Sequence, residues 1–346
     1  MKQRLVPALV ALTLAAPLAF AQAEEKVLNL YSARHYQTDE QLYGEFTRQT
    51  GIKINRIEAN DAALFERLKN EGKNSPADVI IMVDAARIWR AENDGFFQPV
   101  KSAVLDQRIP ANLRGKDEGQ GSPWYGFSKR ARVIVYNKAT VKPEDVATYE
   151  ALADPKNKGK VCTRSGSHPY NLSLVGSLIE RNGEKATEEW AKGIVANFAR
   201  PPRGGDTDQI KGVATGECGV AITNSYYYVR LLRSTKPEEV ELMKNVGFVW
   251  PNATTTGTHF NIGGGGVAAH APHRENAIKF LEYLASDEAQ HYFADGNNEW
   301  PVVASVPAKN PTLDSLGTYK IENVSVAAIG KNQIAAQRIL DRVGYK

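Results

Sequence analysis

Strand-like and helix-like patterns alternate through the first hundred residues of this chain, and this alternation restricts the fold more than any other feature. Apolar or alternating runs at 27–31, 52–57 and 77–83 are typical of β-strands. Between them, apolar residues recur at helical spacing after Thr38 and after Asp61. An order of strand, helix, strand and helix predicts a mostly parallel sheet that is covered by helices on both faces.

The pattern changes near Pro123. Residues 124–127 and 133–136 together predict one long strand that crosses between two lobes. A second α/β unit is expected to follow, from about residue 140 to about residue 250.

The chain is expected to return to the first lobe after residue 257. Four consecutive glycines, 263–266, predict a tight crossover there, because the order and spacing of a phosphate-binding loop are absent. The tail at 324–343 is expected to be helical and to pack on the second lobe.

The N-terminus has the pattern of a secretory signal peptide. Lys2 and Arg4 precede an apolar stretch at 5–20, and small residues then offer cleavage sites near Ala21 and Ala23. We therefore expect residues 1–23 to be removed and the protein to be periplasmic. The formal net charge of +4 falls to +2 without the two basic residues of the leader, which gives no case for nucleic-acid binding.

The chain has only two cysteines, Cys162 and Cys218. In an exported protein an isolated pair of this kind is expected to form a disulfide. The alternative, a soft metal site, has no histidine or cysteine neighbours in the sequence to support it.

Three consecutive tyrosines, 226–228, follow the short apolar run 220–222. Ligands bind at the ends of strands in open α/β sheets, so this run predicts a phenol cluster at a binding site. A phenol has an ordinary pKa of about 10, but a highly charged cation can displace its proton, and tyrosinate is a known ligand of iron. The alternative is that these rings pack at the start of a helix.

Two other segments place candidate ligands at strand ends. Residues 31–36 end the first strand with His35 and Tyr36, which could otherwise be surface residues of a capping loop. Residues 165–171 end another strand and carry Tyr170, whereas His168 is expected only to shape the turn before a proline.

These motifs resemble one known family, the periplasmic ferric-ion-binding proteins that feed ABC iron importers, and in particular its tyrosine-rich branch. The matching segments are 31–36, 77–80, 126–137, 162–170, 224–228 and 300–302, which spread over nearly the whole chain after the leader. The resemblance implies a two-lobed, type II periplasmic-binding-protein fold, in which mixed sheets are joined by crossing hinge strands and iron(III) is held in the cleft.

The resemblance also implies a ligand set. His35 and Tyr36 would come from the first lobe, and Tyr170, Tyr226 and Tyr227 from the second. Better-known ferric binders use a glutamate and a bound carbonate or phosphate. Here Tyr36 and Tyr170 would take those two places, so we expect no such bound anion.

Tyr228 would then be a packing residue. Four phenolates and one iron(III) ion would leave the site with a charge of −1, which Arg34, Arg203 or Arg230 could offset. The partner implied is an ABC permease of the inner membrane, and we expect a monomer.

The domain division that the resemblance implies has two discontinuous lobes. The N-terminal lobe is expected to comprise residues 24–130 and 257–302, and the C-terminal lobe residues 131–256 and 303–346.

Two other functions are compatible with parts of the sequence. A periplasmic receptor for thiamine or a polyamine would share the fold and stack its ligand on the aromatics, but such a site does not need a cluster of phenols. An exported hydrolase or lyase would need a nucleophile with its base or a pair of carboxylates, and no such motif is visible. We therefore predict a binding protein and not an enzyme.

Overall fold

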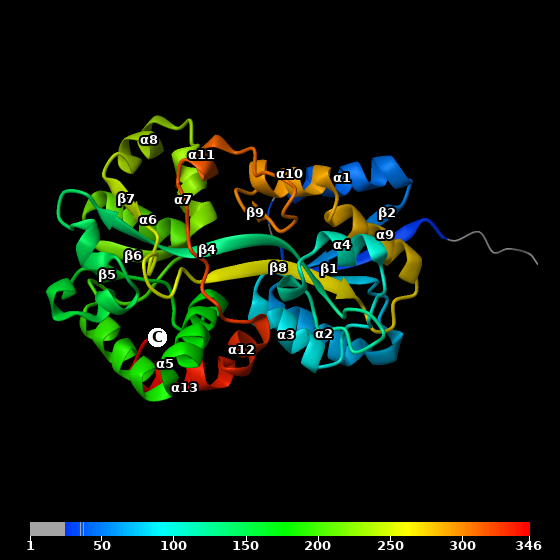
Figure 1. The fold of residues 1–346 in the computed structure, drawn as a ribbon, viewed down its shortest axis with the longest axis horizontal. Coiled ribbons are helices and arrows are strands. Elements are labelled where there is room, and N and C mark those ends of the chain that lie inside the picture. Colours follow the sequence, from blue (N-terminus) through cyan, green and yellow to red (C-terminus); the bar gives the residue numbers. More distant parts are fainter. Residues whose placement is uncertain (1–24, 35, 37) are drawn as a thin grey trace, which may run out of the picture.

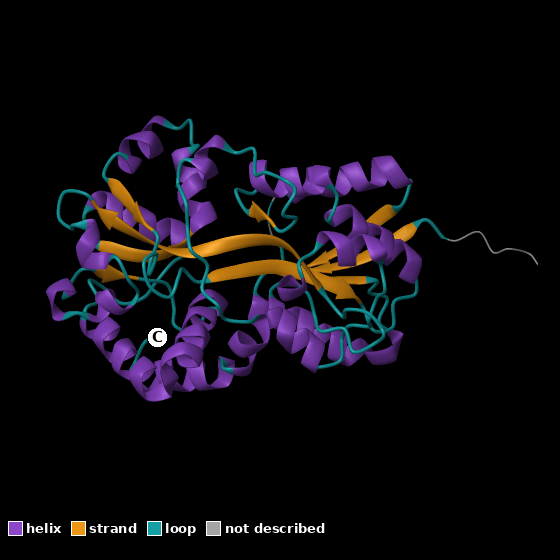
Figure 2. Cartoon of the chain, in the orientation of Figure 1, coloured by secondary structure: helices purple, strands orange, loops and turns teal. Residues whose placement is uncertain are grey.

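The computed structural model describes residues 25–34, 36 and 38–346, so the predicted signal peptide and His35 lie outside the described residues. The chain forms two lobes on either side of a pair of crossing strands (Figures 1 and 2). Nine strands form one continuous, mixed sheet with the order β2-β1-β3-β8-β4-β6-β5, to which β7 and β9 are added by pairing with β4. The prediction of a two-lobed, mixed α/β fold is confirmed.

The first lobe is built on the strand–helix alternation of the N-terminal residues. Its strands β1 and β2 pair in parallel, as do β1 and β3, and β8 then runs antiparallel to β3. The elements are β1 (Val27–Ser32), α1 (Asp39–Thr50), β2 (Lys53–Glu58), α2 (Asp61–Glu71), β3 (Val79–Met82), α3 (Ala85–Asn93), α4 (Ala103–Arg108), β8 (Phe260–Val267), α9 (Arg274–Leu284) and α10 (Asp287–Asp295).

The second lobe repeats the α/β plan around the other end of β4. Its strand β5 pairs in parallel with β6, which is antiparallel to β4. The elements are β5 (Val161–Cys162), α5 (Pro169–Ala196), α6 (Asp206–Thr215), β6 (Val220–Asn224), α7 (Ser225–Leu232), α8 (Pro237–Met243), β7 (Val246–Val249) and α13 (Gln333–Arg342).

Two long strands, β4 and β8, join the lobes. The sequence predicted the first of these, β4, as a crossing strand. The strand β4 (Tyr125–Asn137) pairs with β8 and β9 (Trp300–Pro301) near its start and with β6 and β7 near its end. The two crossing strands are visible at the centre of Figure 1. Because one strand belongs to both halves of the sheet, the lobes share a backbone hinge.

The predicted tight crossover at the four glycines is wrong, because Gly263–Gly266 are extended residues of β8. The glycines are needed for close backbone approach. A Cβ atom at Gly265 would lie 1.9 Å from the carbonyl oxygen of Ile80, and one at Gly264 would lie 2.3 Å from that of Tyr125. Neighbouring strands could not approach so closely if these residues carried side chains.

The C-terminal tail is helical, as predicted, but it contacts both lobes. After α11 (Pro311–Asp314), the helix α12 (Val326–Lys331) lies against α3 of the first lobe and α5 of the second, and α13 packs on α5. Gly330 permits this contact, because a Cβ atom there would lie 2.4 Å from the Trp89 ring. The tail therefore runs beside the hinge and is not confined to the second lobe.

The predicted disulfide between Cys162 and Cys218 is present, with the two Cα atoms 5.8 Å apart. It links the end of β5 to the turn just before β6, inside a cluster of buried apolar residues. Both strands lead directly into segments that carry tyrosines. Among the helices of the described residues, none is both long enough and apolar enough to cross a membrane.

Reduction of this disulfide should lower the free energy of unfolding by about 4 kcal/mol, because the bridge closes a long loop in the unfolded chain. Urea unfolding with and without a reductant measures the difference. The double variant Cys162→Ala/Cys218→Ala is the control, and its midpoint should not respond to reductant. Two titratable thiols in unfolded, unreduced protein would contradict the bridge.

Candidate metal centre

The triple tyrosine begins a helix at the end of a buried strand. The strand β6 ends at Asn224 and α7 begins at Ser225, so the three rings occupy the first turn. Tyr226 is 2 % exposed and Tyr227 is half-buried, and their ring centroids are 4.3 Å apart. Tyr228 points elsewhere and packs on Phe248 at 5.3 Å, in the cluster that contains the disulfide.

A second helix start brings Tyr170 to the same place. Pro169 is the first residue of α5, and the Nδ1 atom of His168 accepts a hydrogen bond from the backbone N–H of Tyr170 at 3.2 Å. His168 therefore caps the helix, which agrees with its predicted role in the turn. The hydroxyl oxygens of Tyr170 and Tyr226 are 3.0 Å apart.

Tyr36 reaches the cluster from the first lobe, from the loop between β1 and α1. Its ring meets that of Tyr226 edge to face, with centroids 5.7 Å apart. The Arg34 guanidinium lies over the Tyr36 ring, 4.6 Å from its centroid. Four of the five predicted ligands thus gather from three separate segments, and the fifth, His35, lies outside the described residues.

The two lobes also touch beside this cluster. The Ser173 hydroxyl of α5 donates a hydrogen bond to Asp84 of the first lobe at 2.7 Å, and the side-chain amide of Asn261 on β8 donates to the same carboxylate at 2.7 Å. All three residues are buried. The cleft is therefore closed around the tyrosines.

Sequence reasoning missed a buried arginine, Arg130, at the centre of the site. Its side chain is 1 % exposed, its guanidinium lies 5.9 Å from the Tyr170 ring centroid, and its three nitrogens donate no hydrogen bond to any described residue. Burial by itself lowers the pKa of Arg130, but the negative charge of Glu299 and that of the nearby phenols when they ionise raise it overall. Arg130 therefore stays charged.

Burial raises the pKa of three of the phenols above the ordinary value, and their mutual repulsion adds to the shift. The pKa of Tyr226 is raised first by burial and then by Tyr170 and Tyr36. The pKa of Tyr36 is raised by burial and then by Glu299, and that of Tyr170 by burial and then by Tyr227. Without a cation these groups are therefore protonated at neutral pH.

A buried network holds the two second-lobe segments together. Arg132, on the same face of β4 as Arg130, pairs with Asp206 at 2.7 Å and donates hydrogen bonds to Asn171 at 2.8 Å and Asn224 at 3.2 Å. Asn171 directly follows Tyr170, and Asn224 lies two residues before Tyr226. One guanidinium thus places the starts of both tyrosine-bearing helices.

Of the three arginines proposed from the sequence to offset the site charge, two lie beside it. Arg34 contacts Tyr36 but is also paired with Asp39 at 2.8 Å, and Arg230 lies 5.0 Å from the Tyr227 ring centroid. Arg203 is exposed and pairs with Glu217. The sequence did contain a signal for the two missed arginines. Arg130 and Arg132 lie on one face of a strand that is otherwise mostly apolar, and a charged side chain in a buried strand needs a buried partner.

Within the described ranges, no group of three or more histidine, cysteine, aspartate or glutamate side chains could hold a metal ion. The tyrosine cluster is a donor set of another kind, made of phenol oxygens surrounded by arginines.

Comparison with known proteins gives the family. Residues 41–317 match the family model of the bacterial extracellular solute-binding proteins. The chain belongs to this family. This chain is 50% identical to iron uptake protein A1 of Synechocystis, and the alignment covers 96% of this chain and 91% of the relative.

Solved structures of similar proteins have the same fold. A Trichodesmium protein (IdiA, FutA) in complex with iron and citrate ligands is 52% identical to this solute-binding protein, with a TM-score of 0.85 over 92% of this chain and all of the other. A ferric binding protein from Campylobacter jejuni is 38% identical, with a TM-score of 0.87 over the same shares of the two chains. These relatives are described as an iron uptake protein, a protein in complex with iron and citrate, and a ferric binding protein.

Removal of the Arg132 side chain should destabilise the second lobe strongly, because it leaves Asp206 buried with Arg164 as its remaining cation. We expect Arg132→Met to lower the free energy of unfolding by about 3 kcal/mol, measured from urea midpoints. Arg203→Met is the matched control, since its exposed ion pair with Glu217 should contribute at most about 1 kcal/mol. Equal midpoints for the two variants would contradict the positioning role of Arg132.

Proposed function

We propose that this protein is a periplasmic receptor that binds iron(III) between its two lobes and delivers it to an ABC permease. The ligands are the oxygens of Tyr36, Tyr170, Tyr226 and Tyr227, with His35 as a further donor. The observation that carries the proposal is the 3.0 Å separation of the Tyr170 and Tyr226 hydroxyl oxygens. Neighbouring oxygens on a small octahedral cation with bonds of about 2.0–2.1 Å lie roughly 2.9 Å apart.

The electrostatics support a trivalent cation bound by phenolates. Four phenolates and one iron(III) ion leave a net charge of −1, and Arg130 lies beside them without a hydrogen-bond partner among the described residues. Thiamine and polyamines are disfavoured, because an organic cation does not displace the phenol protons as iron(III) does and would meet the charge of Arg130 without phenolates to offset it.

The similar proteins support the assignment of iron(III) as the ligand. One is called an iron uptake protein, one a ferric binding protein, and one holds iron and citrate. From them we also infer a periplasmic location, a monomeric receptor and a permease partner. We assign residues 24–130 and 257–302 to the N-terminal lobe, and residues 131–256 and 303–346 to the C-terminal lobe, although α12 in the last segment contacts both lobes.

Iron would act as a bridge between lobes. Tyr36 comes from the first lobe and the other three phenols from the second, so the complete ligand set exists only when the cleft is closed. An ion that binds the closed state better shifts the population toward it. We infer that this closed shape is what the permease recognises.

The iron-loaded protein should be coloured, because phenolates bound to ferric iron absorb visible light by charge transfer to the metal.

Tyr227→Phe removes one oxygen but keeps the ring, so it should weaken iron binding strongly, whereas Tyr228→Phe should leave it almost unchanged. His35→Ala should weaken binding less than Tyr227→Phe. Visible titration against a competing chelator measures all three variants.

Two results would contradict this assignment. A colourless protein that binds stoichiometric iron(III) would exclude phenolate ligands, and equal affinities for the Tyr227→Phe and Tyr228→Phe variants would exclude Tyr227. Urea midpoints of the iron-free variants serve as the control for loss of fold.

Iron binding should weaken in acid. Burial raises the pKa of Tyr36, Tyr170 and Tyr226, so these phenols are protonated in the iron-free protein and must release protons when the ion binds. Affinity should therefore fall by at least about tenfold for each pH unit below neutrality. Titrations from pH 7.5 to 5.5, corrected for protonation of the competing chelator, test this, and a pH-independent affinity would contradict it.

A further inference from the structure

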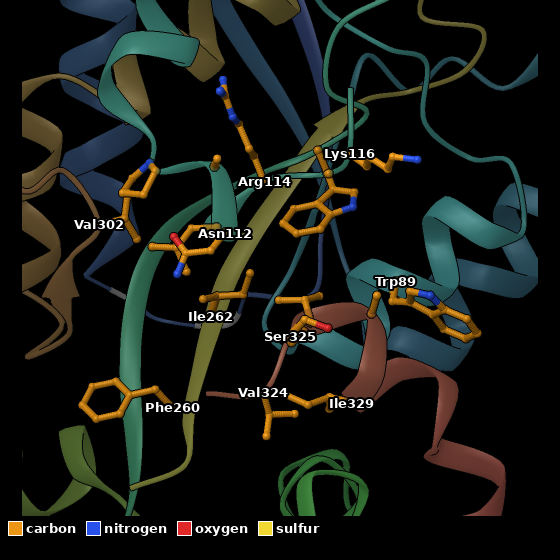
Figure 3. Close-up of a pocket in the computed structure, with 18 of the residues that line it drawn as sticks. Trp89, Asn112, Arg114, Lys116, Phe260, Ile262, Val302, Val324, Ser325 and Ile329 are labelled. Carbon is orange, nitrogen blue, oxygen red and sulfur yellow. The ribbon is translucent and has the colours of Figure 1, made fainter. Parts of the chain in front are cut away.

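A cavity of about 930 Å³ lies beside the crossing strands at the hinge (Figure 3), and none of the four candidate tyrosine ligands lines it. Lys129 and Arg130 are consecutive residues of β4, so their side chains point to opposite faces of the sheet. Arg130 faces the tyrosines, and Lys129 lines the cavity together with Ile262, its partner across β8. The cavity is therefore separate from the proposed iron site.

The walls of this hinge cavity come from several elements that meet at the hinge. Helix α3, the segment 110–117, both crossing strands and the segment 321–329 all contribute. Most of the wall is apolar, with large side chains that include Trp89, Leu113, Trp124, Phe260, Ile262 and Ile329. Its volume lies in the range of about 300–1,000 Å³ that is typical of small-molecule sites.

Lys129 is the charged group of this wall for which the described part of the chain offers no partner. Among the described residues, nothing forms a hydrogen bond or an ion pair with its ammonium group, and burial lowers the pKa of this lysine. The other charged groups of the wall are engaged: Arg114 with Asp106, Lys116 with Glu118, Glu92 with the Trp124 indole, Asp117 with backbone N–H groups, and Glu322 with Ser177 and His259.

We propose that the hinge cavity binds a small amphiphilic monoanion, a carboxylate or sulfonate with an aromatic or aliphatic body. Its acidic group would pair with the Lys129 ammonium, and its body would lie against Trp124 and Ile262. Lys129 indicates that the ligand is negatively charged. A half-buried ammonium without a partner is stabilised by an anion and destabilised by a second cation. The apolar walls decide that the ligand is more than an inorganic ion.

The test uses iron-free protein and 1-anilinonaphthalene-8-sulfonate, an aromatic monoanion that fluoresces in apolar surroundings. We expect one saturable site per chain, from which octanoate displaces the probe. Lys129→Met keeps most of the apolar stem and removes the charge, so it should weaken probe binding by at least about tenfold, as expected for loss of a hydrogen-bonded charge pair. Because no iron is present, the result does not depend on the proposed function.

Two further variants locate the site. Lys244→Met removes the same charge from a side chain that is 64% exposed and paired with Glu241, and it should leave probe binding unchanged. Ala327→Trp places a large ring at an exposed position of the cavity wall and should block the probe while leaving Lys129 in place. Urea midpoints confirm that each variant is folded.

The absence of saturable binding to the unmodified protein would overturn the proposal. So would equal probe affinities for the Lys129→Met and Lys244→Met variants, or probe binding that survives in Ala327→Trp.

Discussion

The strand β4 is the constraint on which the rest of this structure depends. It pairs with β8 and β9 in one lobe and with β6 and β7 in the other, so a single stretch of backbone belongs to both halves of the sheet. Each lobe also has its own buried apolar cluster. Relative motion of the lobes would therefore have to bend these crossing strands, and the middle of β4 is the part that both halves of the sheet share.

Charge on β4 explains how a cluster of phenols can be buried. Four rings from three segments would by themselves be a neutral aromatic patch, and ionising them in a buried site would be unfavourable. Arg130 provides a fixed positive charge beside them, and Arg132 with Asp206 holds the two second-lobe helix starts in place. The free-energy cost of removing these guanidinium groups from water is incurred when the chain folds. It is therefore not a cost of binding the ion. In the proposed iron site, an incoming trivalent cation would complete the charge balance of four phenolates and Arg130.

The two faces of the hinge have different chemistry because consecutive residues of a strand alternate. Arg130 faces the proposed iron(III) site, and Lys129 faces the mostly apolar cavity that we propose as an anion site. The hinge cavity is lined by segments that meet at the hinge, including residues 321–329, and the tyrosine cluster takes side chains from both lobes. Occupation of either site is thus expected to depend on how the lobes are arranged, which links the two faces through the same strand.

The sequence by itself determined the α/β alternation, the crossing strand, the disulfide between the only two cysteines and the candidate phenol ligands. Hydrophobic periodicity and strand ends are local properties, so they can be read without knowledge of distant contacts. Only the tertiary structure decided that Gly263–Gly266 form a strand, because that depends on the backbones that approach them from β3 and β4. It also decided the roles of Arg130 and Arg132, since a buried arginine is defined by partners that lie far away in the chain, such as Asp206, and local patterns carry no record of such pairings.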